Sequence, residues 1–120
     1  MMKRIKSFSV AFKGIGLLFK SQVNARIHLI ATILVIILGC LFKISIIEWL
    51  VISLCIGLVL SLEAINSAIE ILCDKIEPNQ DEFIGKVKDL SAGGVLIGAI
   101  IAAIAGCIIF LPKIIHLLCF

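Results

Sequence analysis

The sequence lacks the short motifs with which soluble enzymes bind nucleotides or activate a nucleophile. It contains no G-x-x-x-x-G-K-[ST] loop, no G-x-G-x-x-G turn after a strand and no Ser-His-Asp set. Its five cysteines stand singly in apolar runs, with no C-x-x-C pair and no second ligand at metal spacing. These absences exclude the familiar phosphate-binding loops and favour a packing role for the cysteines over a metal centre.

Charged residues are also scarce. Only 16% of the 120 residues are charged, whereas 62% are hydrophobic and the mean hydropathy is +1.25. A soluble domain of this size cannot hide so much apolar surface from water, so we expect the chain to lie in a membrane. The longest stretches without a charge are residues 27–42, 49–62 and 90–112. Because about 20 apolar residues cross a bilayer, these stretches and their flanking turns predict spanning helices at about 26–44, 47–76 and 87–111.

Acidic residues are absent from the first 26 positions, which carry six basic ones: Lys3, Arg4, Lys6, Lys13, Lys20 and Arg26. Apolar residues recur there every three or four positions, which predicts an amphipathic helix at about 3–20 in the membrane surface. The segment lacks the clean apolar core of a cleavable signal peptide. The positive-inside rule places it, and the loop with Lys75, Lys86 and Lys88, in the cytoplasm. Its charge suits anionic lipid headgroups, and we expect no nucleic acid partner.

The acidic residues gather in one part of the chain. Seven of the eight lie between Glu63 and Asp89. On a helix, one narrow stripe contains Glu63, Asn66, Glu70, Asp74 and Glu77, because successive members are three or four positions apart. A row of carboxylates near a bilayer is costly to bury unless the groups meet cations, one another or a polar ligand. The stripe is therefore the candidate site.

The chemistry of these groups suggests phosphoryl transfer. Mg²⁺ takes one or two protein carboxylates together with phosphate oxygens, and a nearby lysine neutralises phosphate charge. Such groups are supplied by Glu70, Asp74, Lys88 and Asp89. Glu63 lies deeper, close to where the hydroxyl of a lipid headgroup would sit, and is a candidate general base.

Two features of the expected spans indicate packing or an interface rather than chemistry. Small residues stand four positions apart in the third span, at Gly94, Gly98, Ala102 and Gly106. This register lets helix backbones approach closely and predicts a bundle that oligomerises. His28 opens the first span without a partner at metal spacing, so we expect an interfacial side chain near the headgroups.

Four segments stand out when the chain is taken as a whole: Glu63-Ala-Ile-Asn66-Ser67-Ala-Ile-Glu70 followed by Asp74, Gly85-Lys-Val-Lys88-Asp89-Leu-Ser-Ala-Gly, Phe12-Lys13-Gly14 and Asn24-Ala-Arg26-Ile-His28. Together they resemble the signature of the prokaryotic diacylglycerol kinase family, which includes the undecaprenol kinases. The resemblance implies an all-α integral membrane protein, with a surface helix before three transmembrane helices. It also implies a homotrimer in the bacterial inner membrane, with shared active sites and a cytoplasmic N-terminus, that uses ATP and Mg²⁺.

The resemblance also implies roles for individual residues. Glu63 stands at the position of the catalytic base, and Glu70 at that of the carboxylate that binds the metal on ATP. Nucleotide contacts fall to Glu70, Asp74, Lys88 and Asp89, with Asp81 from a polar loop whose residue types match less well. Asn66 and Ser67 support the geometry of the site. Gln22 departs from the family pattern, because members commonly carry there a glutamate that binds a second metal; an amide oxygen still coordinates a cation, with less charge compensation.

The acceptor and two rival functions stay open at this point. Diacylglycerol, giving phosphatidic acid, is the first expectation and undecaprenol the alternative, because both present one hydroxyl above long apolar tails. A small cation- or proton-conducting subunit would use Glu63 and Glu70 to line a polar path, but only Ser53 and Ser61 are polar among residues 49–62. A purely structural subunit would leave the acidic stripe unexplained. A lipid kinase with a cytoplasmic site fits best.

Overall fold

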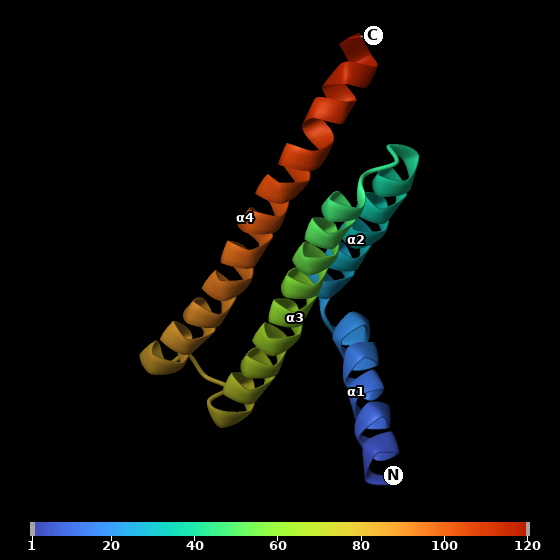
Figure 1. The fold of residues 1–120 in the computed structure, drawn as a ribbon. Helices are drawn as coiled ribbons and strands as arrows, with labels where there is room; N and C mark the ends of the chain where they lie inside the picture. The colour runs from blue at the N-terminus through green and yellow to red at the C-terminus, as the bar shows by residue number, and fades with distance from the viewer. Residues whose placement is uncertain (1, 120) are drawn as a thin grey trace.

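The computed structural model describes residues 2–119, which form four helices joined by short connections (Figure 1). The helices are α1 (Met2–Ser21), α2 (Val23–Leu41), α3 (Ile46–Ile76) and α4 (Glu82–Cys119). No strand occurs in this part of the chain, and α2, α3 and α4 are each long and apolar enough to cross a membrane. The structure therefore confirms the expected all-α membrane fold, with one helix ahead of three potential spans.

Local sequence explains where the two longest helices begin and where α3 ends. Ser45 and Glu48 form a capping box at the start of α3: the Glu48 amide donates to Ser45 Oγ at 3.2 Å, and the Ser45 amide donates to Glu48 Oε1 at 3.0 Å. The helix stops just before Pro78, whose ring does not fit a helix interior. Asp81 then caps α4, because its Oδ2 accepts the Ile84 amide at 3.0 Å.

The last helix extends further at both ends than the span expected at 87–111. Polar residues from Glu82 onward already belong to it, and it continues through Pro112 to Cys119. Proline removes one amide donor, a defect that a long apolar helix tolerates where neighbouring groups take up the freed carbonyl. The first turns of α4 consequently lie at the same end of the bundle as the last turns of α3 (Figure 1).

Helix α3 is the central element of the bundle. It packs against α4 and against α2, whereas α2 and α4 have no close backbone approach to each other within residues 2–119. The buried core consists of Ile44, Ile52, Ile109 and Phe110, near the connection between α2 and α3. Gly39 allows the Trp49 indole to approach α2, because a Cβ at that position would lie 2.6 Å from Trp49 Cη2. The packed core therefore lies at the end of α3 opposite the acidic stripe.

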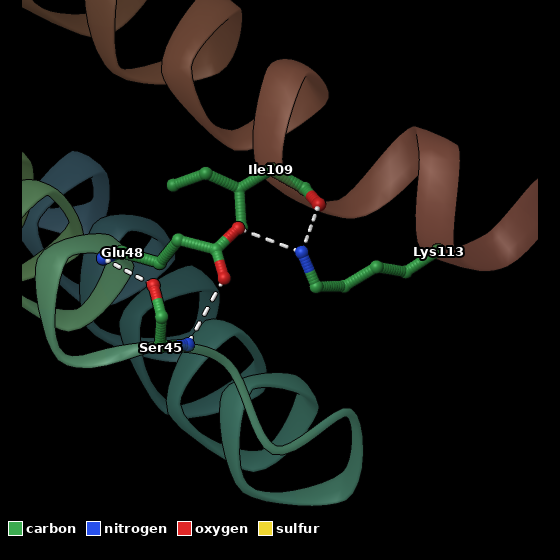
Figure 2. Close-up of polar contacts among 4 residues, drawn as sticks. All are labelled: Ser45, Glu48, Ile109 and Lys113. Carbon is green, nitrogen blue, oxygen red and sulfur yellow. Dashed lines mark hydrogen bonds and ion pairs between the residues drawn. The ribbon is translucent and has the colours of Figure 1, made fainter.

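A polar clasp joins α3 to α4 beside this core. Lys113 Nζ donates to Glu48 Oε2 at 2.6 Å and to the carbonyl oxygen of Ile109 at 3.1 Å, while Glu48 also completes the capping box with Ser45 (Figure 2). Both charged side chains are partly shielded, at 30% exposure for Lys113 and 26% for Glu48. Charge-assisted bonds of this kind fix the relative position of the two helices at that end.

One of the small residues spaced four positions apart on α4 packs closely against α3 of the same chain. A Cβ at Gly98 would lie 2.7 Å from Leu62 Cδ1 on α3, whereas Cβ atoms at Gly94 and Gly106 would have no neighbour within 4 Å. Gly98 therefore marks the close approach of α4 to α3. The open space at the other two glycines leaves room for lipid or for another helix.

Large apolar side chains cover much of the outside of the bundle. Leu54 is 74% exposed and Ile108 is 69% exposed, and many other leucines and isoleucines of α2, α3 and α4 are at least half exposed. Contiguous apolar surface on this scale is unfavourable in water and fits lipid tails or partner helices. The chain is accordingly a membrane protein.

Candidate active site

The acidic stripe of α3 runs from buried to exposed. Glu63 is 2% exposed and is the most deeply buried large side chain of residues 2–119, whereas Glu70 is half-buried and the Asp74 side chain is 65% exposed. Because α3 is unbroken to Ile76, these groups keep one helical face. A single face of α3 thus carries carboxylates in three different environments.

Glu63 meets α2 through a histidine. The imidazole Nε2 of His28 lies 3.6 Å from Glu63 Oε2, which makes an ion pair when the imidazole is protonated, and the His28 side chain is 24% exposed. His28, which the sequence predicts near the lipid headgroups, is therefore in contact with Glu63, the most buried carboxylate of the stripe. Both residues belong to segments that carry the family resemblance, but nothing in the sequence indicates that they contact each other.

Two polar side chains next to Glu63 are buried with unused hydrogen-bonding capacity. Asn66 is 5% exposed and Ser67 is 4% exposed. Asn66 Nδ2 donates to Glu70 Oε1 at 3.3 Å, but Asn66 Oδ1 and Ser67 Oγ have no hydrogen-bond partner among residues 2–119. Buried polar atoms in native proteins nearly always have a partner, so these two oxygens point to a ligand, a water or a neighbouring chain.

Lys88 and Asp74 join the start of α4 to the end of α3. Lys88 Nζ donates to Asp74 Oδ1 in a close charge-assisted bond between side chains that are 37% and 65% exposed. The structure thus brings together two residues predicted for the nucleotide site. Asp89 is exposed and makes no hydrogen bond or ion pair within the described chain.

The loop between these helices borders a polar hollow. The hollow has a volume of about 490 Å³ and is lined by Glu77 to Glu82, Ile84, Gly85 and Lys88. Glu77 Oε1 accepts the Asn79 amide at 3.1 Å, and Asp81 caps α4, so both carboxylates already have local roles. Lys88 contributes a positively charged side chain to the lining of this hollow.

Gln22 lies at the junction of α1 and α2 and does not belong to the α3 stripe. It lines a mostly apolar hollow between α1 and α3, of about 370 Å³, together with Ser67, Ala64 and Gly14. No group of three or more His, Cys, Asp or Glu side chains with metal-binding geometry occurs in residues 2–119. Glu70 and Asn66 therefore place a carboxylate and an amide side by side on α3, where they suit a cation whose other ligands are phosphate oxygens.

Comparison with known proteins identifies the family. Residues 9–110 match the model of the prokaryotic diacylglycerol kinases. The chain is 41% identical to an undecaprenol kinase of Bacillus subtilis, covering 91% of this chain and 89% of the relative. It is 34% identical to a diacylglycerol kinase of Synechocystis, covering 93% and 65%, and 30% identical to one of Escherichia coli, covering 88% and 86%. The chain belongs to the prokaryotic diacylglycerol kinase family of lipid kinases, as its motifs predict.

Proposed function

We propose that the protein transfers the γ-phosphoryl group of ATP to the hydroxyl of a membrane lipid at the cytoplasmic face. The graded burial of the α3 carboxylates supports this most directly. The rise of the helix separates Glu63 from Glu70 by about 10 Å along its axis. A hydroxyl that arrives from the bilayer therefore meets the buried carboxylate, while phosphates that arrive from water meet Glu70 and Asp74.

Glu63 acts in this proposal as the general base. Its side chain is 2% exposed, so little water competes for contact with the carboxylate. The proton of the acceptor hydroxyl passes to Glu63 as the acceptor oxygen forms a bond to the γ-phosphorus. The bond between that phosphorus and the β–γ bridging oxygen breaks, and ADP leaves with the electron pair.

Glu70 is the proposed ligand for Mg²⁺. Asn66 Nδ2 holds Glu70 Oε1 at 3.3 Å and leaves Asn66 Oδ1 free to accept a donor or to coordinate a cation. Gln22 is proposed as a second, neutral contributor of a metal-binding oxygen. When bound, Mg²⁺ offsets the charge of the β- and γ-phosphate oxygens.

Lys88, Asp74, Asp89 and Asp81 form the proposed nucleotide side of the site. Lys88 and Asp74 are bonded to each other at the end of α3 that faces the polar hollow. Phosphate oxygens compete with the Asp74 carboxylate for the Lys88 ammonium, because both are anionic acceptors of the same charge-assisted bonds. Asp89 is free to contact the nucleotide, and Asp81 holds the neighbouring loop.

We further propose that the protein works as a homotrimer in the bacterial inner membrane, with the N-terminus and the site in the cytoplasm. Basic residues precede the first span and flank the loop before α4, which supports this orientation. Exposed apolar helix faces and unpartnered buried oxygens at Asn66 and Ser67 support sites that are completed by a neighbouring subunit.

The proposed acceptor is undecaprenol or a similar polyprenol, ahead of the diacylglycerol expected first. Identity to the undecaprenol kinase is 41%, compared with 34% and 30% to the two diacylglycerol kinases. The apolar helix faces alone do not distinguish the two lipids, so the choice of acceptor is based on sequence similarity.

Purified protein in mixed micelles tests the proposal with Mg²⁺ and ATP labelled at the γ-phosphate. Each lipid is offered separately, and a reaction without lipid is the control. We expect labelled polyprenyl phosphate, with kcat/KM about tenfold or more above that for diacylglycerol. Preference for diacylglycerol would reverse the choice of acceptor, and the absence of label in any lipid would refute kinase activity.

A further inference from the structure

The surroundings of Glu63 raise the question of what keeps its carboxylate charged. Within residues 2–119 the side chain has one polar contact, the His28 imidazole at 3.6 Å. Burial of a carboxylate without a compensating cation or donor is so costly that the group takes up a proton instead. A protonated carboxyl group cannot accept the proton of a lipid hydroxyl. A base at Glu63 therefore requires a partner that favours the ionised form.

Other charged groups around Glu63 do not supply that partner. Arg26, on the same helix as His28, is exposed and makes no ion pair in the described chain. On α3 itself, the nearest charged residue of the stripe is another acid, Glu70, which is bonded to Asn66. The side chains of α4 that line the groove next to His28 are Ala99, Ala102 and Ala103, together with Gly106.

His28 is well placed for this task. It lines a mostly apolar groove of about 300 Å³ between α2, α3 and α4, together with side chains such as Val35, Ile52 and Val59. One turn later on α2, the Thr32 hydroxyl donates to the His28 carbonyl oxygen at 2.7 Å. Because the His28 side chain is 24% exposed, a positive charge on its imidazole would keep some contact with solvent while it pairs with the buried carboxylate.

We propose that His28 is a positioning residue for the base: as imidazolium, it holds the Glu63 carboxylate ionised and directed toward the acceptor hydroxyl. This inference rests on the proposed function of Glu63 and adds a second residue, on a different helix, to the reaction. His28 itself contacts neither ATP nor the reacting atoms. The proton taken from the lipid hydroxyl goes to Glu63, and His28 contributes only through that carboxylate.

Kinetics of His28→Gln test the proposal, since glutamine is of similar size and can still donate a hydrogen bond but carries no charge. We expect kcat to fall about tenfold or more, with KM for ATP and for the lipid within about twofold of wild type. In a Glu63→Gln background the same change should cause no further loss, because a residue that acts only through Glu63 has nothing left to act on. Thr32→Val is the matched control, because Thr32 lies on the same helix and lines the same groove but has no hydrogen bond to Glu63.

Infrared spectroscopy gives a readout that does not depend on turnover. The difference spectrum between wild type and Glu63→Gln should show a carboxylate band, and the same difference taken in the His28→Gln background should show a protonated carboxyl band. A carboxylate band in both backgrounds would overturn the proposal. Undiminished kcat in His28→Gln, an equal loss in Thr32→Val, or a further tenfold loss in the double variant would also overturn it. Failure of all lipid phosphorylation would refute the proposed function, while the infrared result would still decide the charge of Glu63.

Discussion

Replacement of Gly98 by leucine tests how α4 is positioned against the α3 stripe. A Cβ at Gly98 would lie 2.7 Å from Leu62 Cδ1, well inside the ordinary contact distance, and Leu62 directly precedes Glu63. Leu62 Cδ1 is the end of a flexible side chain and can move away from a Cβ alone, but a leucine has further atoms to place between α4 and α3, and overpacking of this kind costs about 1–3 kcal/mol. The gain in helix propensity on replacing glycine is only about 1 kcal/mol, so steric overlap dominates.

The displacement should reach the active site as well as the fold. A shift of about 1 Å in a catalytic group can lower a rate by about 10²-fold. We therefore expect Gly98→Leu to lower both the thermal unfolding temperature in detergent and kcat. Gly94→Leu, four residues earlier on the same register, is the matched control, since a Cβ there has no neighbour within 4 Å.

Measurement of unfolding temperature, kcat and cross-linked oligomer for both variants separates two interpretations of the small-residue register. Contact within the chain predicts a large effect for Gly98→Leu and a small one for Gly94→Leu. If both variants lost oligomer to the same extent while the unfolding temperature stayed unchanged, the register would be a subunit interface and the argument from Leu62 would be refuted.

Two other substitutions probe the metal site and the clasp. Glu70→Gln keeps the shape of the side chain but removes its charge. The Mg²⁺ concentration for half-maximal activity should therefore rise about tenfold or more, and kcat should fall. An unchanged Mg²⁺ titration would show that Glu70 does not bind the metal. Lys113→Met breaks the bond to Glu48, at 2.6 Å, and should lower the thermal unfolding temperature slightly. Because Glu48 and Glu63 are about 22 Å apart along α3, kcat should be unaffected; a fall in kcat at unchanged stability would show that the clasp acts on the site.

Local patterns in the sequence predict the helices and the stripe. Apolar runs of span length predict α2, α3 and α4. Spacing by three and four residues places Glu63, Asn66 and Glu70 on one helix face. These features depend on residues close together in the chain. Their prediction requires no knowledge of how one helix packs on another.

Contacts between helices cannot be predicted from local sequence patterns. The pairing of His28 with Glu63 depends on the rotation and depth of α2 against α3, and the clasp joins Glu48 to a lysine 65 positions later. The spacing of small residues likewise predicts a close approach at Gly98 but does not say that the neighbour is Leu62 of the same chain. Periodicity in the sequence predicts which residues share a helix face, whereas the packing of the helices determines which residues that face contacts.

Substitution of Glu63 by glutamine tests the central claim most directly. The variant keeps the size of a buried side chain that is 2% exposed, while it removes the group proposed to accept the lipid proton. Steady-state kinetics at saturating Mg²⁺ should show kcat lowered by about 10²-fold or more, with KM for ATP and for the lipid nearly unchanged. Full turnover, or a defect confined to the KM for ATP, would contradict the assignment of Glu63 as the base.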